Sequence, residues 1–270
     1  MAEETFEIPL EAAETYEAVF VPALFAEWAP LVADAAGLSP GQAVLDAACG
    51  TGIVAREAAR RVAPSGRVVG VDRNEAMLTV ARRVAPGLEW RRADVADLPF
   101  ADGEFDAVLC QMALMFFPDR SAALGELGRV TAPAGTLALA VPAAIGDQPA
   151  YRPFVEVAAR HAGPEALSLL GAYWASGDVG DLRSWCEAGG LEVLDVRTHT
   201  GTARFGSTDE LVATEVNGSP LAARISDEVY ERIRADTAVA LAGFVAADGT
   251  LPAPLAGHLV TARPSGRRGG

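Results

Sequence analysis

The sequence contains no lysine, because all 22 of its basic residues are arginines. Schiff-base chemistry and a lysine general base are therefore excluded. There are only three cysteines, Cys49, Cys110 and Cys186, too few and too scattered for a disulfide framework or a zinc cluster. We expect no metal site, and a reducing cytoplasmic compartment.

Excess positive charge and long apolar segments are also missing. The formal net charge is −14, and no basic face is visible that could neutralise nucleic-acid phosphates. Residues 1–4 lack the pattern of a signal peptide, and no uninterrupted apolar run is long enough to span a bilayer. These absences favour a small molecule as partner, with neither a nucleic acid nor a membrane span.

Hydrophobic sequence is abundant: it makes up 50% of the 270 residues, enough for a sizeable core. We expect a single domain over residues 1–263, followed by a disordered tail over 264–270. Pro22 is expected to split the N-terminal helical region into two helices. The expected parts of the domain are an N-terminal helical cover (1–38), a core (43–143) and helical lid segments (147–180 and 207–247).

Apolar strands alternate with helical stretches through the core and beyond it. Strands are predicted near 43–46, 67–71, 88–93, 105–112, 136–141, 191–198 and 258–262. This alternation predicts an α/β fold with a seven-stranded, mostly parallel sheet, helices on both faces and helical lid insertions.

Three aspartates stand at predicted strand ends: Asp46, Asp72 and Asp94. The carboxyl ends of parallel strands share one edge of a sheet, so these carboxylates should converge on one cleft and favour a cationic ligand. Gly50 and Gly52 follow the first strand, where they permit a sharp turn and a close approach of a ligand to the backbone.

The glycine turn is compatible with two cofactors. Gly50-x-Gly52-x-x-Ala55 fits the dinucleotide fingerprint, and Asp72 stands at the spacing of about 20 residues expected for a ribose-binding acid. A pyrophosphate, however, needs N–H donors where Asp46 stands. S-adenosyl-L-methionine carries a sulfonium and an ammonium but no phosphate, and Asp46 therefore favours it over NAD. An NAD-dependent oxidoreductase, and a cofactor-binding protein without methyl transfer, stay open as alternatives.

The motifs of the core resemble a known family. Asp46-x-Ala48-x-Gly50-x-Gly52 is similar to the first motif of class I S-adenosylmethionine-dependent methyltransferases of the ubiquinone/menaquinone-biosynthesis type, which have a Rossmann-like fold. Further segments that resemble motifs of this family are Val68 to Asp72, Arg92 to Phe100, Phe105 to Cys110 with Met115 to Asp119, and Pro133-Ala134-Gly135. Ala48 and Ala134 replace glycines of the family pattern.

The resemblance implies roles for individual residues. Asp46 would hold the methionine ammonium, Asp72 the ribose hydroxyls and Asp94 the adenine amino group, while Gln111 would face the methionine part or the transferred methyl. Arg73 or Met77 would flank the adenine, and Val95 would offer a backbone contact. The implied cofactor set is Asp46, Ala48, Gly50, Gly52, Asp72, Arg73, Met77, Ala93, Asp94, Val95 and Gln111.

The acceptor is expected to be a small apolar or aromatic molecule, methylated on oxygen or carbon by in-line displacement without a metal. An oxygen acceptor usually needs a base, for which His161 and His199 are the candidates, with His258 behind them. The predicted pocket residues are Tyr16, Phe20, Met115, Phe117, Tyr151 and Trp174. Packing roles for these aromatic residues are the alternative, and neither the acceptor nor the oligomeric state can be read from the sequence.

Overall fold

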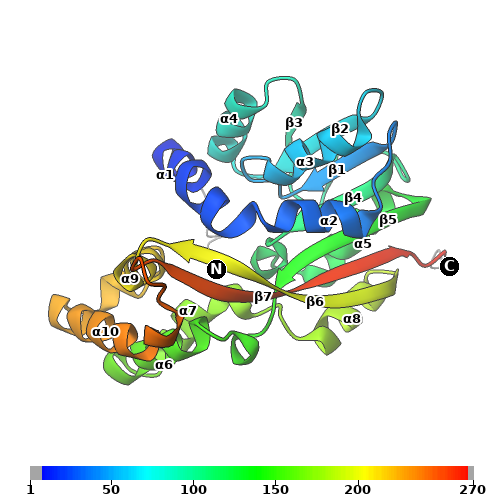
Figure 1. Cartoon of the computed structure of the whole chain (residues 1–270). Coiled ribbons are helices and arrows are strands. Elements are labelled where there is room, and N and C mark those ends of the chain that lie inside the picture. Colours follow the sequence, from blue (N-terminus) through cyan, green and yellow to red (C-terminus); the bar gives the residue numbers. More distant parts are fainter. Residues whose placement is uncertain (1–7, 267–270) are drawn as a thin grey trace. The chain divides into compact units, whose positions relative to one another are not determined.

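A computed structural model describes residues 8–266 (Figure 1). Its contacts divide the chain into two compact units. Unit 1 comprises the residues up to Val141, Val179–Arg197 and the residues from His258 onward, whereas unit 2 comprises Pro142–Asp178 and Thr198–Gly257. Nearly all of both predicted lid segments lies in unit 2. The domain boundaries stay a prediction.

A seven-stranded sheet has the order β3-β2-β1-β4-β5-β7-β6. Strand β1 pairs in parallel with β2 and β4, β2 with β3, and β4 with β5. The predicted seven-stranded, mostly parallel α/β fold is confirmed. The strands are β1 Ala43–Ala47, β2 Arg67–Asp72, β3 Glu89–Arg92, β4 Phe105–Gln111, β5 Thr131–Pro142, β6 Leu191–Phe205 and β7 Leu251–Pro264.

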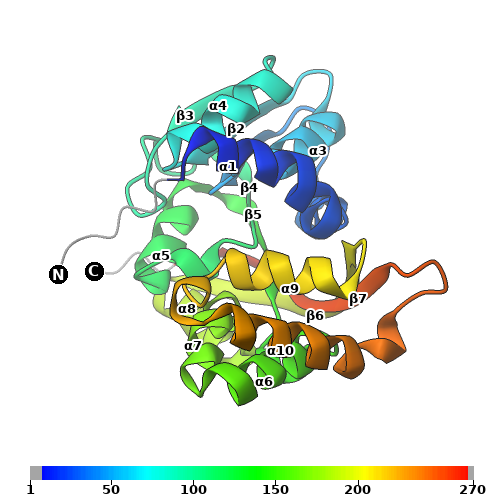
Figure 2. The same ribbon diagram turned by 90° about the vertical axis from the view of Figure 1, so that its left-hand side faces the viewer.

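Helices of unit 1 pack on these strands and on each other. Helix α2 lies on α3 and β4, α1 lies on α4, and α5 lies on α8; Figure 2 shows α1 beside α4. These helices are α1 Leu10–Thr15, a π-helix η1 Tyr16–Phe25, α2 Trp28–Ala36, α3 Ile53–Val62, α4 Glu75–Val84, α5 Arg120–Val130 and α8 Val179–Ala188, with a short 3₁₀ turn η2 Leu114–Phe116.

Local sequence signals place the helix ends. The Asn74 side chain accepts hydrogen bonds from the N–H groups of Ala76 and Met77, which starts α4. Asp119 does the same for α5 by accepting from Ala122. Gly37, at φ 65°, ends α2 in the left-handed conformation that glycine favours. Capping therefore fixes these helices at the ends of the neighbouring strands.

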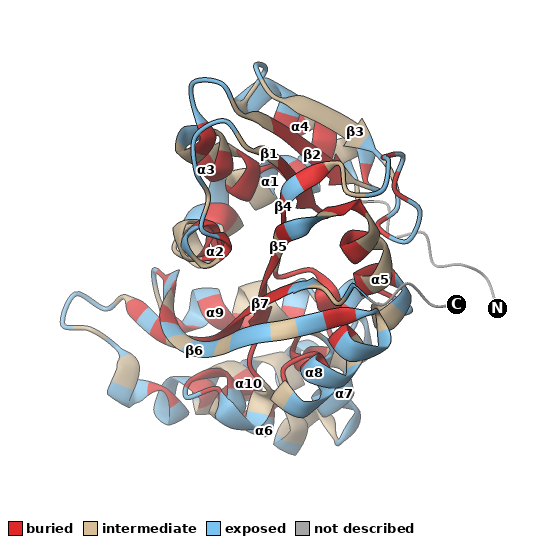
Figure 3. Cartoon of the chain, turned by 90° about the vertical axis from the view of Figure 1, so that its right-hand side faces the viewer, coloured by how far each residue is buried: buried red, intermediate tan, exposed pale blue. Residues whose placement is uncertain are grey.

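The core of unit 1 consists of the central strands and the helices α5 and α8. Strand residues on β1, β2, β4 and β5 pack in one buried cluster with these helices (Figure 3). Burial on both faces explains why these strands are nearly continuous apolar runs. Leading members are Leu45, Val69, Val108, Leu137, Leu124, Leu127 and Leu182.

Unit 2 is mainly helical. Helix α10 packs on α6 and α9, and α6 packs on α7. The side chain of Gln148, only 1% exposed, donates to Ala143 O and Ala256 O and accepts from Ala256 N. The elements of this unit outside β5, β6 and β7 are η3 Ile145–Asp147, α6 Tyr151–Ala162, α7 Glu165–Gly171, η4 Ala172–Trp174, α9 Thr208–Asn217, η5 Ala222–Arg224, α10 Asp227–Ala240 and η6 Ala242–Phe244.

The prediction that Pro22 splits two helices is wrong. Pro22 lies inside the π-helix η1, and the helical run is interrupted only after Phe25. In a π-helix the backbone follows a wider hydrogen-bonding register, so the missing N–H and the ring of a proline can be accommodated.

Three predicted boundaries at the C-terminal side are also wrong. Strand β6 continues to Phe205, so His199 lies within it and not after it, and β7 already begins at Leu251. Pro264 still belongs to β7, and the Ser265 N–H donates to Gly190 O, so the tail is fixed this far. Residues 267–270 of the predicted tail, and residues 1–4 of the signal-peptide prediction, lie outside the described residues.

Candidate functional site

The turn between β1 and α3 has an unusual backbone. Ala48, Gly50 and Gly52 have φ values of 53°, 54° and 86°, in the region that favours glycine. The Cys49 N–H donates to Val71 O at 2.9 Å, which ties the turn to β2. Ala48 thus adopts the left-handed geometry that the family pattern assigns to glycine, at the cost of backbone strain.

Trp90 lies under this turn, a role that the sequence analysis missed. A Cβ atom added at Gly52 or at Gly70 would overlap the indole ring of Trp90. The indole N–H donates to Ala85 O at 3.0 Å. Gly70 and Trp90 are direct neighbours on β2 and β3, so a glycine inside an apolar strand, opposite a tryptophan, is the signal that could have revealed this packing.

Asp46 is buried at the end of β1, with 1% of its surface exposed. Its Oδ2 accepts from the Ala55 N–H at 2.8 Å, which fixes the first turn of α3. Burial, and to a lesser degree the nearby Asp72 carboxylate, raises the pKa of Asp46 to about 8, although the bond from Ala55 opposes this rise. The proposed contact with the methionine ammonium stays a prediction.

Asp72 joins the two loops at its end of the sheet. Its Oδ2 accepts from the Gly50 N–H and its Oδ1 from the Asn74 N–H, both at 2.8 Å. Burial raises its pKa, and these backbone bonds oppose that rise. Each carboxylate oxygen has a second acceptor position, which leaves Asp72 able to accept from a ligand hydroxyl.

Asp94 is exposed and forms a local turn, accepting from the Ala96 N–H at 2.9 Å. Arg73 lies 4.0 Å from its carboxylate, between the guanidinium Nη1 and Oδ2, so the two residues meet across the ends of β2 and β3. Val95 follows with 9% exposure, and the Ala93 N–H donates to Asp72 O. These predicted adenine-side residues lie close together, with Met77 half-buried on α4.

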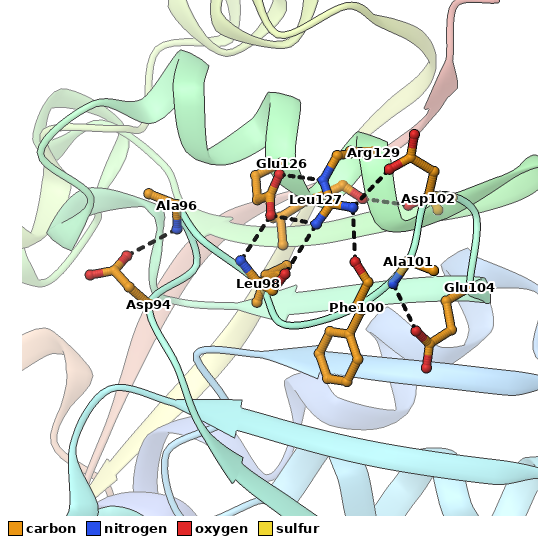
Figure 4. Close-up of polar contacts among 11 residues, drawn as sticks. Asp94, Ala96, Leu98, Phe100, Ala101, Asp102, Glu104, Glu126, Leu127 and Arg129 are labelled. Carbon is orange, nitrogen blue, oxygen red and sulfur yellow. Dashed lines mark hydrogen bonds and ion pairs between the residues drawn. The ribbon is translucent and has the colours of Figure 1, made fainter.

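A second network holds the segment after Asp94 (Figure 4). The Arg129 guanidinium donates to Leu98 O, Phe100 O and the Asp102 carboxylate. Glu126 pairs with Arg129 at 2.7 Å and accepts from the Leu98 N–H. Through Glu126 and Arg129, helix α5 therefore anchors the segment that follows Asp94.

The N-terminal π-helix lies against the glycine turn. The Tyr16 ring is 3.6 Å from the position of a Cβ on Gly50, and it stacks on Phe25 and Phe20 at centroid distances of 5.2 and 6.1 Å. Burial and then the Asp72 charge raise the pKa of Tyr16. Tyr16, predicted as a pocket residue, thus touches the predicted cofactor turn.

Gln111 ends β4, and its Nε2 donates to Phe25 O at 3.1 Å. The next residue, Met112, has φ 52°, a strained value for a side chain of its size. Met115 and Phe117 are 8% and 7% exposed. Their burial is what packing demands, and a pocket role for them stays a prediction.

The remaining predicted residues belong mostly to unit 2. Tyr151 and Trp174 pack together with ring centroids 4.8 Å apart. His161 Nε2 lies 2.8 Å from Asp236 Oδ2, which links α6 to α10, while His199 lies on β6. Their catalytic roles stay predictions. Glu215 of α9, which sequence reasoning missed, has a pKa raised to about 7 by burial.

No group of three or more metal-ligating side chains occurs within residues 8–266. In the same part of the chain, no single helix is long and apolar enough to cross a membrane. The bent pair Leu10–Phe25 and Trp28–Ala36 passes that test of length and composition only when its two helices are joined, across a bend of 67°.

The fold and the turn place the protein in one structural class. Its members have a seven-stranded α/β sheet, a glycine turn after β1 and carboxylates at the ends of β1 and β2. Residues 45–139 match the model of the methyltransferase domain family. This part of the chain is therefore similar to methyltransferase domains, and the predicted resemblance is confirmed there.

Curated relatives and a solved structure agree with this class. The chain is 37% identical over 118 residues to 2-phytyl-1,4-naphtoquinone methyltransferase of Synechococcus elongatus, covering 42% of this chain and 51% of that protein. It is 41% identical over 114 residues to demethylmenaquinone methyltransferase of Renibacterium salmoninarum, covering 42% and 46%. The chain thus spans about half the length of these relatives.

Phosphoethanolamine N-methyltransferase 2 of Haemonchus contortus, solved in complex with S-adenosyl-L-methionine, superposes with a TM-score of 0.61 at 16% identity. The match covers 97% of this chain and 59% of that one. At this identity the likeness supports the fold alone. The ligand of that solved structure, S-adenosyl-L-methionine, is the cofactor that the sequence predicts for this chain.

Proposed function

We propose that the protein transfers a methyl group from S-adenosyl-L-methionine to a small apolar or aromatic molecule, on oxygen or carbon and without a metal. The observation that carries the proposal is the ring of groups around the glycine turn. Asp72 accepts there from the Gly50 N–H, and Asp46 accepts from the Ala55 N–H of α3. A phosphate-free seat lined by carboxyl groups fits a cationic adenosyl cofactor better than it fits a pyrophosphate.

The adenosyl half is assigned to residues at the ends of β2 and β3. Asp72 would accept from the ribose hydroxyls with the lone pairs that its backbone bonds leave free. Asp94 would accept from the adenine amino group, with Arg73 opposite it at 4.0 Å. Met77 and Val95 would give the adenine ring apolar contacts.

The methionine half is assigned to the turn and to Gln111 at the end of β4. When bound, S-adenosyl-L-methionine supplies an electrophilic methyl group on its sulfonium. The chain contributes position and exclusion of water, and well-oriented encounters are worth roughly 7–11 kcal/mol of the barrier. The buried turn residues, among them Asp46 and Thr51 at 1% exposure each, provide such a water-poor environment.

We assign the acceptor to the aromatic and apolar residues Tyr16, Phe20, Met115 and Phe117 of unit 1. Tyr151 and Trp174 of unit 2 stay separate predictions for contact with the acceptor. Relatives named as methyltransferases of a phytylnaphthoquinone and a demethylmenaquinone support a ring compound as acceptor. For a hydroxyl acceptor, His161 or His199 would take the proton. For an electron-rich ring carbon, little basic help is needed.

We also propose a cytoplasmic protein that does not bind nucleic acid. The three free cysteines, all buried, support a reducing compartment. The net charge of −14 opposes binding to phosphate backbones.

The test is transfer of a labelled methyl group from S-adenosyl-L-methionine to a series of quinols, phenols and amines. We expect label in an aromatic or apolar acceptor, and loss of transfer in Asp72→Ala but not in the exposed control Asp209→Ala. Tight binding of the cofactor without transfer to any acceptor would favour the non-methylating alternative. Stabilisation by NAD alone would favour an oxidoreductase.

A further inference from the structure

Three buried side-chain oxygens of unit 1 have no hydrogen-bond partner among the described residues. They are Glu17 Oε2 on the π-helix, Thr51 Oγ1 in the glycine turn and Gln111 Oε1 at the end of β4. A buried polar atom without a partner is costly and uncommon in folded proteins. Three such atoms from three separate segments of the chain indicate a shared ligand.

Hydrogen bonds and one ring contact connect the three residues into one region. Arg56 pairs with Glu17 Oε1 at 2.9 Å and donates to Thr51 O at 2.8 Å. Gln111 donates to the carbonyl of Phe25, whose ring stacks on Tyr16, the neighbour of Glu17 in the chain. Because Tyr16 also lies against Gly50, all three oxygens belong to the surroundings of the glycine turn.

The chemistry of this region matches a zwitterionic amino acid. Glu17 Oε2 and Gln111 Oε1 only accept hydrogen bonds, which suits an ammonium with its three N–H donors. Thr51 can donate a hydrogen bond and Arg56 adds positive charge, which suits a carboxylate. The side chains of Arg56 and Glu17 are only 17% and 21% exposed, so water screens these charges weakly.

Asp46 alone serves the ammonium less well. Its Oδ2 already fixes α3 through Ala55, and burial keeps its proton bound up to about pH 8. Glu17, by contrast, has Arg56 as a charged partner and keeps its second oxygen available.

We propose that Glu17, with Thr51 and Gln111, binds the amino-acid end of the cofactor. The N-terminal π-helix is then part of the cofactor site and not only a packing cover. This inference rests on the proposed function, because it assigns residues to one end of the proposed cofactor. Binding of that end ties Tyr16–Phe25 to the turn more firmly than in the free protein.

The test compares two ligands by isothermal titration calorimetry. S-adenosyl-L-homocysteine carries the amino-acid end, whereas 5′-methylthioadenosine lacks it and keeps the adenosyl part. Glu17→Gln should lower the affinity for S-adenosyl-L-homocysteine by about 10- to 100-fold, the range expected for a lost hydrogen bond to a charged group. Binding of methylthioadenosine should change less than about twofold.

The matched control is Glu14→Gln. Glu14 lies on the adjoining helix α1 and pairs with Arg83 at the surface, where its side chain is 45% exposed. This variant should bind both ligands as the wild type does. Thr51→Val, which keeps the side-chain shape, is the second probe and should also weaken only the homocysteine ligand.

If Glu17→Gln and Thr51→Val weaken the binding of both ligands equally, these residues are structural and the inference is overturned. Unchanged binding of both ligands would overturn it as well. Failure of the wild type to bind either ligand would instead refute the proposed function. Hydrogen exchange gives an independent reading: S-adenosyl-L-homocysteine should protect Tyr16–Phe25 more than methylthioadenosine does, and equal protection would contradict the inference.

Discussion

Replacing Gly70 by alanine should destabilise unit 1 through a steric conflict with Trp90. A Cβ at position 70 would overlap Cζ3 and Cε3 of the indole, and would lie 3.1 Å from Cys49 Sγ. The ring has little freedom to move away, because its N–H is bonded to Ala85 O. Overpacking of this kind costs about 1–3 kcal/mol.

The assay is urea or thermal unfolding of Gly70→Ala alone and in a Trp90→Leu background. For domains of roughly 150–250 residues, about 1 kcal/mol corresponds to a Tm change of about 2–4 °C. In the Trp90→Leu background the alanine should cost less than about 0.5 kcal/mol, because the conflicting ring is gone. Gly87→Ala is the control, since no atom lies within 4 Å of a Cβ at that position.

The same conflict should reach the ligand site. Trp90 also lies against the position of a Cβ on Gly52, so a displaced indole shifts the glycine turn. S-adenosyl-L-homocysteine should bind Gly70→Ala more weakly than wild type. A Gly70→Ala protein of wild-type stability, or one whose loss is identical in the Trp90→Leu background, would refute this account of the packing.

Three further predictions concern single groups. Because burial raises the pKa of Asp46 to about 8, the folded protein keeps a proton on Asp46 that the unfolded chain loses above about pH 4. The contribution of Asp46 to the free energy of unfolding therefore falls as the pH rises from about 4 to about 8. Asp46→Asn should flatten this pH dependence, measured by urea unfolding. Ala48→Gly should raise stability by up to about 1 kcal/mol, since relief of the left-handed strain at φ 53°, about 1–2 kcal/mol, exceeds the added chain entropy of about 0.4–1 kcal/mol; a lower Tm would contradict this. His161→Ala breaks the 2.8 Å contact with Asp236, so it should lower kcat for a hydroxyl acceptor if His161 is the base, whereas a change in Tm alone would make it structural.

The sequence predicted β1, β2 and β4 closely because each is a buried apolar run that ends at or next to a polar residue. Strands β1, β2 and β4 begin within a residue of the expected positions. Strands β5, β6 and β7 were predicted too short, whereas β3 was predicted one residue too long at each end. Pro252 and Pro254 interrupt the β pattern at the start of β7, and the stretch His199–Phe205 of β6 mixes polar and small residues.

Contacts between distant segments of the chain could not be read from the sequence. Glu17 and Arg56 are 39 residues apart, and their ion pair depends on how η1 lies against α3. The surroundings of Asp72 were predictable as to place, because strand ends share one edge, but its bond to the Gly50 N–H depends on the shape of the turn. Sequence reasoning therefore located the site, and the structure adds which side chains share it.

The most direct test of the central claim is calorimetric binding of S-adenosyl-L-homocysteine and of NAD to the wild type and to Asp72→Ala. The account predicts binding of S-adenosyl-L-homocysteine alone. Loss of hydrogen bonds to the charged Asp72, about 1.5–3 kcal/mol each, should weaken it by at least about tenfold in the variant. Binding of NAD without S-adenosyl-L-homocysteine, or equal affinity of wild type and Asp72→Ala for S-adenosyl-L-homocysteine, would contradict the account.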